Sequence, residues 1–283
     1  SGSDVPKRGR RHRSVMTADA STGPVGLSDS LLGHYARFSC YNSPYPAHDR
    51  GCAVDLYPDD GTAPAPVPGE IVATRTVGCP DRPYAVGQDH LVVVDVADDW
   101  AGGRGTDLLA RILHVDPGVS AGDWVDAGDS LGETVRSGFF GRWVDDHLHL
   151  GFRPAGANPY RASGSLPVAP DVPIQGAPWD GTGAVIEVGR TYVRLDTPAH
   201  PDPGVWATLA ADDGTPLDGG LAHYSGGGAY GANARVVSLL GTDVGTATPR
   251  MGVAGADVDW GEIAVHVEGG GQSERATGLS LFA

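Results

Sequence analysis

The stretch His90–Val96, which reads HLVVVDV, is short, rich in β-branched residues and bounded by Gly and Asp. Two similar stretches lie on either side of it, Gly69–Thr74 (GEIVAT) and Leu108–His114 (LLARILH). Short aliphatic runs that end at turn-forming residues are typical of β-strands, and long helical patterns are absent between them. We therefore predict a mainly β fold, in which residues 26–165 form one domain of short strands.

The rest of the chain has the same character but is interrupted by glycine pairs and triples such as Gly226–Gly228. A stretch rich in Pro, Ala and Gly predicts a linker over 166–178. Residues 179–283 are predicted to form a separately folded, all-β, sandwich-like module that targets or anchors the protein. Its expected strands are 184–188, 191–195, 235–240 and 262–267. Residues 1–25 have little apolar pattern and are expected to form a basic flexible tail.

The chain of 283 residues has a formal net charge of −15, although residues 7–13 hold five of its 20 lysines and arginines. Lys7 is the only lysine, and aspartate greatly outnumbers glutamate. An Asp-rich, Lys-poor surface is typical of proteins from salt-loving archaea, where carboxylates keep a protein soluble in brine. A GC-rich genome would also exchange Lys for Arg. Strong acidity argues against general nucleic-acid binding by the folded part, and the basic tail is either solvated or in contact with an acidic partner.

The sequence contains no run of 18 apolar residues, so no transmembrane segment is predicted. No apolar signal-peptide core follows the basic N-terminus, which leaves earlier processing or another export route open. Three cysteines cannot all pair: one disulfide and a free thiol would suit an exported protein, and three thiols a cytoplasmic one. We expect a disulfide between Cys40 and Cys52 that holds the loop carrying His48, with Cys79 as the competitor for either partner.

The first candidate functional pair is His147 and His149, in the stretch DDHLHLGF at residues 145–152. Alternate residues of a strand face the same side, about 6.6 Å apart, so the two imidazoles can share one pocket. One of them could bind a metal while its neighbour reaches a substrate. The alternative is a pair of incidental surface histidines.

The second candidate pair is His48 and Asp55, in HDRGCAVDL at residues 48–56. If residues 51–57 form a strand, Asp55 can face the pocket while Val54 packs in the core. Two histidines and a carboxylate give zinc three ligands and leave a fourth position for water, as hydrolysis requires. His114 ends an apolar strand before a turn, and is either a third functional histidine or an ordinary strand-end residue.

Together these pieces resemble the lysostaphin/LytM-type zinc metallopeptidase family, because several of its landmarks occur in the family's order. They cover residues 48–159 and leave the tail and the C-terminal module aside. After the His48 and Asp55 pair comes GTAPAPVPGEIVA at 61–73, which is similar to the family segment GTPVxAxxxGxV. The next segment, LH at 113–114 with VSAGDWVDAGDSLG at 119–132, is similar to HL…V…GDxVxxGxxIG. Then follow HLHLGF at 147–152, like HLHF, and Asn158-Pro159, like the closing NP.

The resemblance implies one zinc ion per chain, with His48, Asp55 and His149 as its ligands. It assigns His114 and His147 to catalysis, where they orient or deprotonate the attacking water and stabilise the oxyanion. The implied fold of this domain is an antiparallel β-sheet with a groove over the metal. No HExxH motif is present, so histidines rather than a paired glutamate must carry the proton.

One spacing departs from the family pattern, since the first metal pair is usually His-x-x-x-Asp and here the two residues are seven apart. The related D-Ala-D-Ala carboxypeptidases have His-x-x-Gly-x-Ala-x-Asp, which His48, Gly51, Ala53 and Asp55 match in full. The longer spacing is thus compatible with the shared zinc geometry. Cys52, at the shorter spacing, is the rival ligand, although the strand pattern puts it on the face opposite Asp55.

These features predict a zinc metalloendopeptidase acting on a cell-envelope or cell-wall peptide, located outside the cell, on its surface or on a virion. Two alternatives remain. One is a virion-tail or envelope structural protein that carries the peptidase domain and is attached to a larger particle by its C-terminal module. The other is a non-catalytic binding relative. A bacterial wall cross-link is the substrate that the family implies, whereas a halophilic archaeon would offer a surface-layer protein instead.

Overall fold

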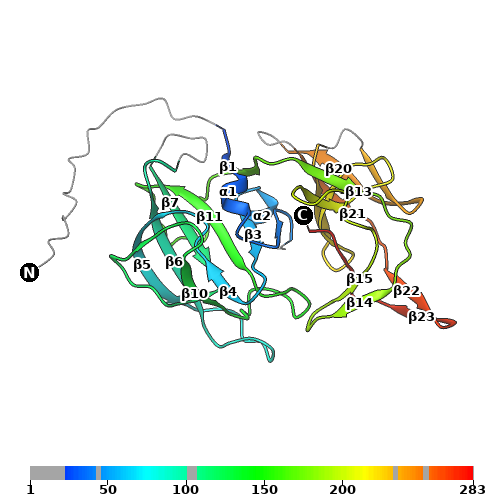
Figure 1. The fold of residues 1–283 in the computed structure, drawn as a ribbon, viewed down its shortest axis with the longest axis horizontal. Coiled ribbons are helices and arrows are strands. Elements are labelled where there is room, and N and C mark those ends of the chain that lie inside the picture. The colour runs from blue at the N-terminus through cyan, green and yellow to red at the C-terminus, as the bar shows by residue number, and fades with distance from the viewer. Residues whose placement is uncertain (1–22, 43–45, 101–106, 232–234, 251–254, 283) are drawn as a thin grey trace, which may run out of the picture.

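The computed structural model describes residues 23–42, 46–100, 107–231, 235–250 and 255–282, so most of the predicted tail lies outside the described residues. Two β-rich modules lie side by side, the N-terminal one coloured blue to green and the C-terminal one yellow-green to red (Figure 1). Helix in the described part is confined to α1 (Asp29–Leu32) and α2 (Pro46–Asp49), and no helix there is long and apolar enough to cross a membrane. The predicted mainly β fold with two modules is confirmed.

The N-terminal module is built on a seven-stranded sheet in which each neighbouring pair of strands is antiparallel. From edge to edge its strands are β2 (Arg37–Ser39), β3 (Val54–Tyr57), β11 (Leu148–Pro154), β7 (Leu108–Leu113), β6 (Asp89–Val96), β5 (Gly69–Val77) and β9 (Trp124–Val125). A three-stranded sheet of β4 (Thr62–Pro64), β10 (Ser130–Thr134) and β8 (Val115–Pro117) shares its core. The strands expected at 69–74, 90–96 and 108–114 correspond to β5, β6 and β7.

Burial on both faces explains why β6 is so uniformly aliphatic. Val92 and Val94 are fully buried in the main core of the N-terminal module. Leu91 and Val93 are buried on the opposite face of the sheet, where they pack with Leu109. A central strand covered on both faces has no solvent side on which polar residues would be favoured. This rigid strand and its neighbours carry the candidate site at one end.

A short parallel ribbon closes the N-terminal module, in which β1 (Val25–Leu27) pairs with β12 (Val168–Pro170). The C-terminal module begins with β13 (Ile174–Ala177), so the stretch 166–178, predicted as a linker, contains two whole strands, β12 and β13. Its main sheet has six strands, in the order β19 (Val236–Leu239), β20 (Thr242–Pro249), β21 (Ala256–Trp260), β18 (Gly226–Ala229), β17 (Leu217–Leu221) and β24 (Leu279–Ser280). Three ribbons complete it: β13 with β16 (Trp206–Leu209), β14 (Val185–Val188) with β15 (Val193–Leu195), and β22 (His266–Gly269) with β23 (Gln272–Arg275).

The C-terminal module has a hydrophobic core of its own, formed around Leu217, Val258 and Trp260. Of its expected strands, 184–188, 191–195 and 235–240 match β14, β15 and β19, whereas the last one is displaced. The strand there begins at His266 and not at 262, because Gly270 and Gly271 adopt φ of 59° and 80° and form a tight turn. A two-residue turn with positive φ at both positions sets the register of a hairpin, and so selects the residues on either side of it.

Candidate metal centre

The register of the sheet brings the five predicted site residues together. Asp55 in β3 lies directly opposite His149 in β11. His147 precedes β11 by one residue, His114 follows β7, and His48 lies in α2, just before β3. Four of the five are almost fully buried, and the His149 side chain is 16% exposed. Buried ionisable groups are stable only when they are paired with one another or bind a metal.

Three candidate ligand atoms form a nearly equilateral triangle. Asp55 Oδ1 lies 2.9 Å from His149 Nδ1 and 3.1 Å from His48 Nε2, and the two ring nitrogens are 3.2 Å apart. Tetrahedral zinc with ligand bonds of about 2.0–2.1 Å separates neighbouring ligand atoms by roughly 3.3 Å. The triangle matches one face of such a tetrahedron, and its fourth corner would be open to water and substrate. Two imidazoles and a carboxylate therefore fit zinc both in chemistry and in spacing.

The far side of the His48 ring fixes which nitrogen is free. His48 Nδ1–H donates a hydrogen bond of 2.9 Å to the backbone carbonyl of Cys40. Nε2, which faces Asp55 and His149, can then present its lone pair to a metal. Metal-binding histidines usually donate their second ring N–H to an acceptor of this kind, which holds both the tautomer and the ring orientation.

His114 is held by an aspartate that the sequence analysis did not identify, Asp89 at the start of β6. His114 Nδ1–H donates to Asp89 Oδ2 at 2.6 Å, the His114 backbone N–H donates to Oδ1 at 3.0 Å, and Ser137 Oγ donates to Oδ2 at 2.6 Å. His114 has a φ of 71°, which a residue with a Cβ rarely adopts. Such backbone strain is found most often at functional sites. Here it accompanies the two hydrogen bonds that His114 donates to Asp89, from its backbone N–H and from its ring.

His147 is oriented in the same way as His48. Its Nδ1–H donates to the Asp145 carbonyl at 2.8 Å, so Nε2 is free and lies 3.6 Å from Asp55 Oδ1. The His147 ring packs against Phe140 at 4.6 Å and against Tyr57 and His114 at 5.1 Å, measured between ring centroids. His114 and His147 therefore lie side by side next to the triangle, among aromatic rings.

Burial and mutual charge set the protonation of the centre. Burial by itself would raise the pKa of Asp55, but the charges of His48 and His147 and the hydrogen bonds with His149 hold it well below its ordinary value. Burial lowers the pKa of His149 to about 4 and lowers that of His147 as well. For His48, burial lowers the pKa, but Asp55 outweighs this and raises it. The ionised carboxylate and the neutral rings of His147 and His149 suit a divalent cation, and a cation that binds would displace the proton that Asp55 favours on His48.

The C-terminal module holds the segment that carries His48. Arg250 Nη2 donates a hydrogen bond of 3.0 Å to the backbone carbonyl of His48, and the same guanidinium forms an ion pair with Asp257. Asp218, which is fully buried in β17, accepts from the Cys40 backbone N–H at 2.8 Å. Since the Cys40 carbonyl binds His48 Nδ1, both contacts fix the position of this ligand. The sequence analysis missed them, because no local spacing signals a partner so distant in the chain.

The three cysteines are free, so the predicted bond between Cys40 and Cys52 is wrong. Cys40 is buried in the main core, where burial raises the pKa of its thiol, and Cys52 donates its S–H to the Arg50 carbonyl at 3.4 Å. Cys79 forms no disulfide either. Among the described residues, the group of side chains placed to bind a metal consists of His48, Asp55 and His149, without the rival ligand Cys52.

No curated protein matches this chain. Among solved structures, the chain is similar to the solution structure of lysostaphin, with a TM-score of 0.30 and 14% identity over 92% of this chain and 98% of that one. A likeness of this extent does not establish a shared fold. Two family models match, the DUF8155 N-terminal domain over residues 26–170 and the DUF8155 C-terminal domain over residues 175–283. The chain therefore belongs to the DUF8155 family, a family whose two domains are both described as being of unknown function.

Proposed function

We propose that this chain is a zinc-dependent endopeptidase that hydrolyses a peptide of the cell envelope or cell wall. The observation that carries the proposal is the triangle of Asp55 Oδ1, His48 Nε2 and His149 Nδ1, whose sides of 2.9–3.2 Å suit one zinc ion. The order of motifs that resembles the lysostaphin-type peptidases also supports it. One zinc ion, when bound, would supply a Lewis acid that lowers the pKa of water and polarises the scissile carbonyl.

The roles of the two other histidines follow from their hydrogen bonds. His147 presents Nε2 as an acceptor next to the ligand triangle, because its Nδ1–H is occupied by the Asp145 carbonyl. We assign to it the removal of a proton from the attacking water and its later return to the leaving amine. A neutral imidazole suits this role, and burial lowers the pKa of His147.

His114 differs from His147 in having a carboxylate behind it. Asp89 accepts the His114 Nδ1–H and would stabilise a positive charge on the ring. We therefore assign to His114 a hydrogen bond, from Nε2, to the oxygen that becomes negative when the peptide carbonyl is attacked. Asp89 and Ser137 act as positioning residues for this ring.

Zinc analysis together with a peptide assay tests the proposal. The purified chain should hold about one equivalent of zinc, and a chelator should abolish hydrolysis of a glycine-rich wall peptide or a surface-layer peptide until zinc is restored. His266→Ala, at an exposed histidine of the C-terminal module, serves as the matched control and should change neither property. Zinc binding without any peptide hydrolysis would instead indicate a non-catalytic binding protein, and absence of zinc would exclude the whole assignment.

A further inference from the structure

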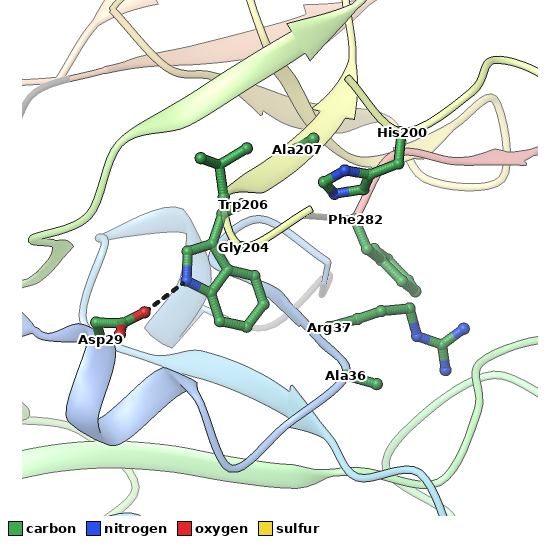
Figure 2. A pocket seen from close by; sticks show the side chains of 9 residues that line it. Asp29, Ala36, Arg37, His200, Gly204, Trp206, Ala207 and Phe282 are labelled. Atoms are coloured by element: carbon green, nitrogen blue, oxygen red, sulfur yellow. Dashed lines mark hydrogen bonds between the residues drawn. The ribbon is translucent and has the colours of Figure 1, made fainter. Parts of the chain in front are cut away.

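A cavity of about 450 Å³ lies between the two modules, outside the metal centre. On the N-terminal side it is bordered by Asp29, Ala36 and Arg37, and on the C-terminal side chiefly by the segment 204–207 and Phe282. Figure 2 shows the indole of Trp206 next to Asp29, and the ring of Phe282 next to Arg37 and Ala36. The cavity therefore combines flat apolar walls with charged groups, as small-molecule and peptide subsites do.

Arg37 is the unusual component of this cavity. Its Nε–H is buried and has no hydrogen-bond partner, and its nearest anion is Asp145, 3.3 Å from Nη2. The guanidinium lies 5.2 Å from the Tyr57 ring centroid and 5.9 Å from that of Phe282. Aromatic rings hold a cation in place without using up its N–H donors. Arg37 is thus a preorganised cation whose side chain is 34% exposed, in a chain whose net charge is −15.

The opposite charge in the cavity is Asp29. The Trp206 Nε1–H donates to Asp29 Oδ1 at 3.4 Å, which draws this carboxylate towards the indole (Figure 2). Trp206 is further held by an edge contact with Phe38, with ring centroids 5.0 Å apart. The two charges therefore have different partners, Asp145 for Arg37 and Trp206 for Asp29.

The cavity is connected to the metal centre through one aromatic residue. Tyr57 lies under Arg37, stacks on Phe282 at 4.8 Å and packs against His147 at 5.1 Å. A group that binds Arg37 would therefore lie one ring away from the histidine to which we assign the proton transfer.

We infer that the cavity binds a carboxylate of the peptide substrate through Arg37, with the adjoining apolar side chain against Trp206 and Phe282. A guanidinium is the side chain best suited to a carboxylate, because its parallel N–H groups match the two oxygens. The carboxylate comes from either the C-terminus of the peptide or an acidic side chain. This inference deepens the proposed function and rests on it for the identity of the ligand as a substrate.

A binding experiment on zinc-free protein tests the site without requiring activity. N-acetylphenylalanine should bind and change the tryptophan fluorescence. Its amide should bind more weakly by a factor of about ten or more, because the amide lacks the negative charge. Trp206→Phe should remove the fluorescence change, which assigns the signal to this cavity. Equal binding of acid and amide to the unaltered chain would overturn the inference, whatever the outcome of the peptidase assay.

Substitution of the cation provides the second arm. Arg37→Gln should reduce the affinity for N-acetylphenylalanine about tenfold and bring it to that of the amide, while the control Arg75→Gln, at an exposed arginine over the Tyr160 ring, should not. In the peptidase assay, peptides with a free C-terminus or an internal Glu, each paired with its amide, distinguish the two carboxylate sources by their KM. A loss of overall stability would weaken acid and amide alike, so an unchanged acid-to-amide ratio in Arg37→Gln would contradict the inference.

Discussion

The two sides of the candidate centre are held by different parts of the molecule. The proposed ligand side consists of His48, Asp55 and His149, and its His48 is fixed from the C-terminal module by Arg250 and, through Cys40, by Asp218. The proposed catalytic side consists of His114 and His147, whose Nδ1–H groups donate to acceptors of the N-terminal module. Residues of both sides lie at the neighbouring ends of strands β3, β11 and β7.

Because of this difference, substitutions should be able to change metal affinity and turnover separately. Metal affinity should depend on residues of both modules, because one ligand is positioned across their boundary. Turnover at saturating zinc should depend mainly on the N-terminal module, because its histidines and their partners lie there. Outer hydrogen-bond partners of metal ligands typically affect affinity or activity 10–100-fold, which makes the distinction measurable.

The largest effect is expected for a ligand. His149→Ala removes one corner of the triangle and should abolish tight zinc binding, reducing the content of purified protein from about one equivalent to near zero. Zinc content is measured by elemental analysis after dialysis. His266→Ala, at an exposed histidine in β22, is the control and should keep its zinc. Full zinc retention by His149→Ala would exclude the residue as a ligand.

A comparably clear but different result is expected on the catalytic side. His147→Ala or His114→Ala should reduce turnover of a peptide substrate by about 100-fold or more while zinc remains bound, because general acid–base catalysis typically contributes that much. Zinc content and kcat are measured on the same preparations. If either variant loses its metal, that histidine belongs to the ligand side and its assigned role is incorrect.

A smaller loss is expected for the residue behind His114. Asp89→Asn keeps the size of the side chain but removes the charge that would stabilise an imidazolium, and should lower kcat by about 10–100-fold with unchanged zinc affinity. Asp98→Asn, at an exposed aspartate just after β6, is the matched control. A zinc affinity that falls in Asp89→Asn as much as the turnover would break the proposed separation between the two sides.

The sequence predicted the parts of the centre that local pattern encodes. The aliphatic runs at 69–74, 90–96 and 108–114 predicted β5, β6 and β7, because such runs are stable only as buried strands. Asp89 was missed, although an antiparallel pairing of the second and third runs puts residue 89 beside His114. Asp218 and Arg250 could not be predicted, since their contacts span about 180–200 positions and depend on how two separate cores dock.

The last prediction concerns that docking directly. Asp218 accepts hydrogen bonds from the Cys40 backbone N–H at 2.8 Å, Ser39 Oγ at 2.6 Å and Tyr230 at 2.5 Å, and an asparagine has only one oxygen with which to replace them. Asp218→Asn should therefore loosen the Cys40 carbonyl that orients His48, and weaken zinc binding about tenfold.

The measurement is a competition titration with a chromophoric chelator, followed by kcat at saturating zinc. In Asp218→Asn, kcat should be within about twofold of the unaltered chain, because His114 and His147 keep their partners. The control is Asp212→Asn, since Asp212 also accepts backbone N–H bonds, from Leu240 and Gly241, but lies on the far edge of the module's main sheet, beside β19. If Asp218→Asn binds zinc as tightly as this control, the C-terminal module does not position the ligand side, and the contrast between the two sides is wrong.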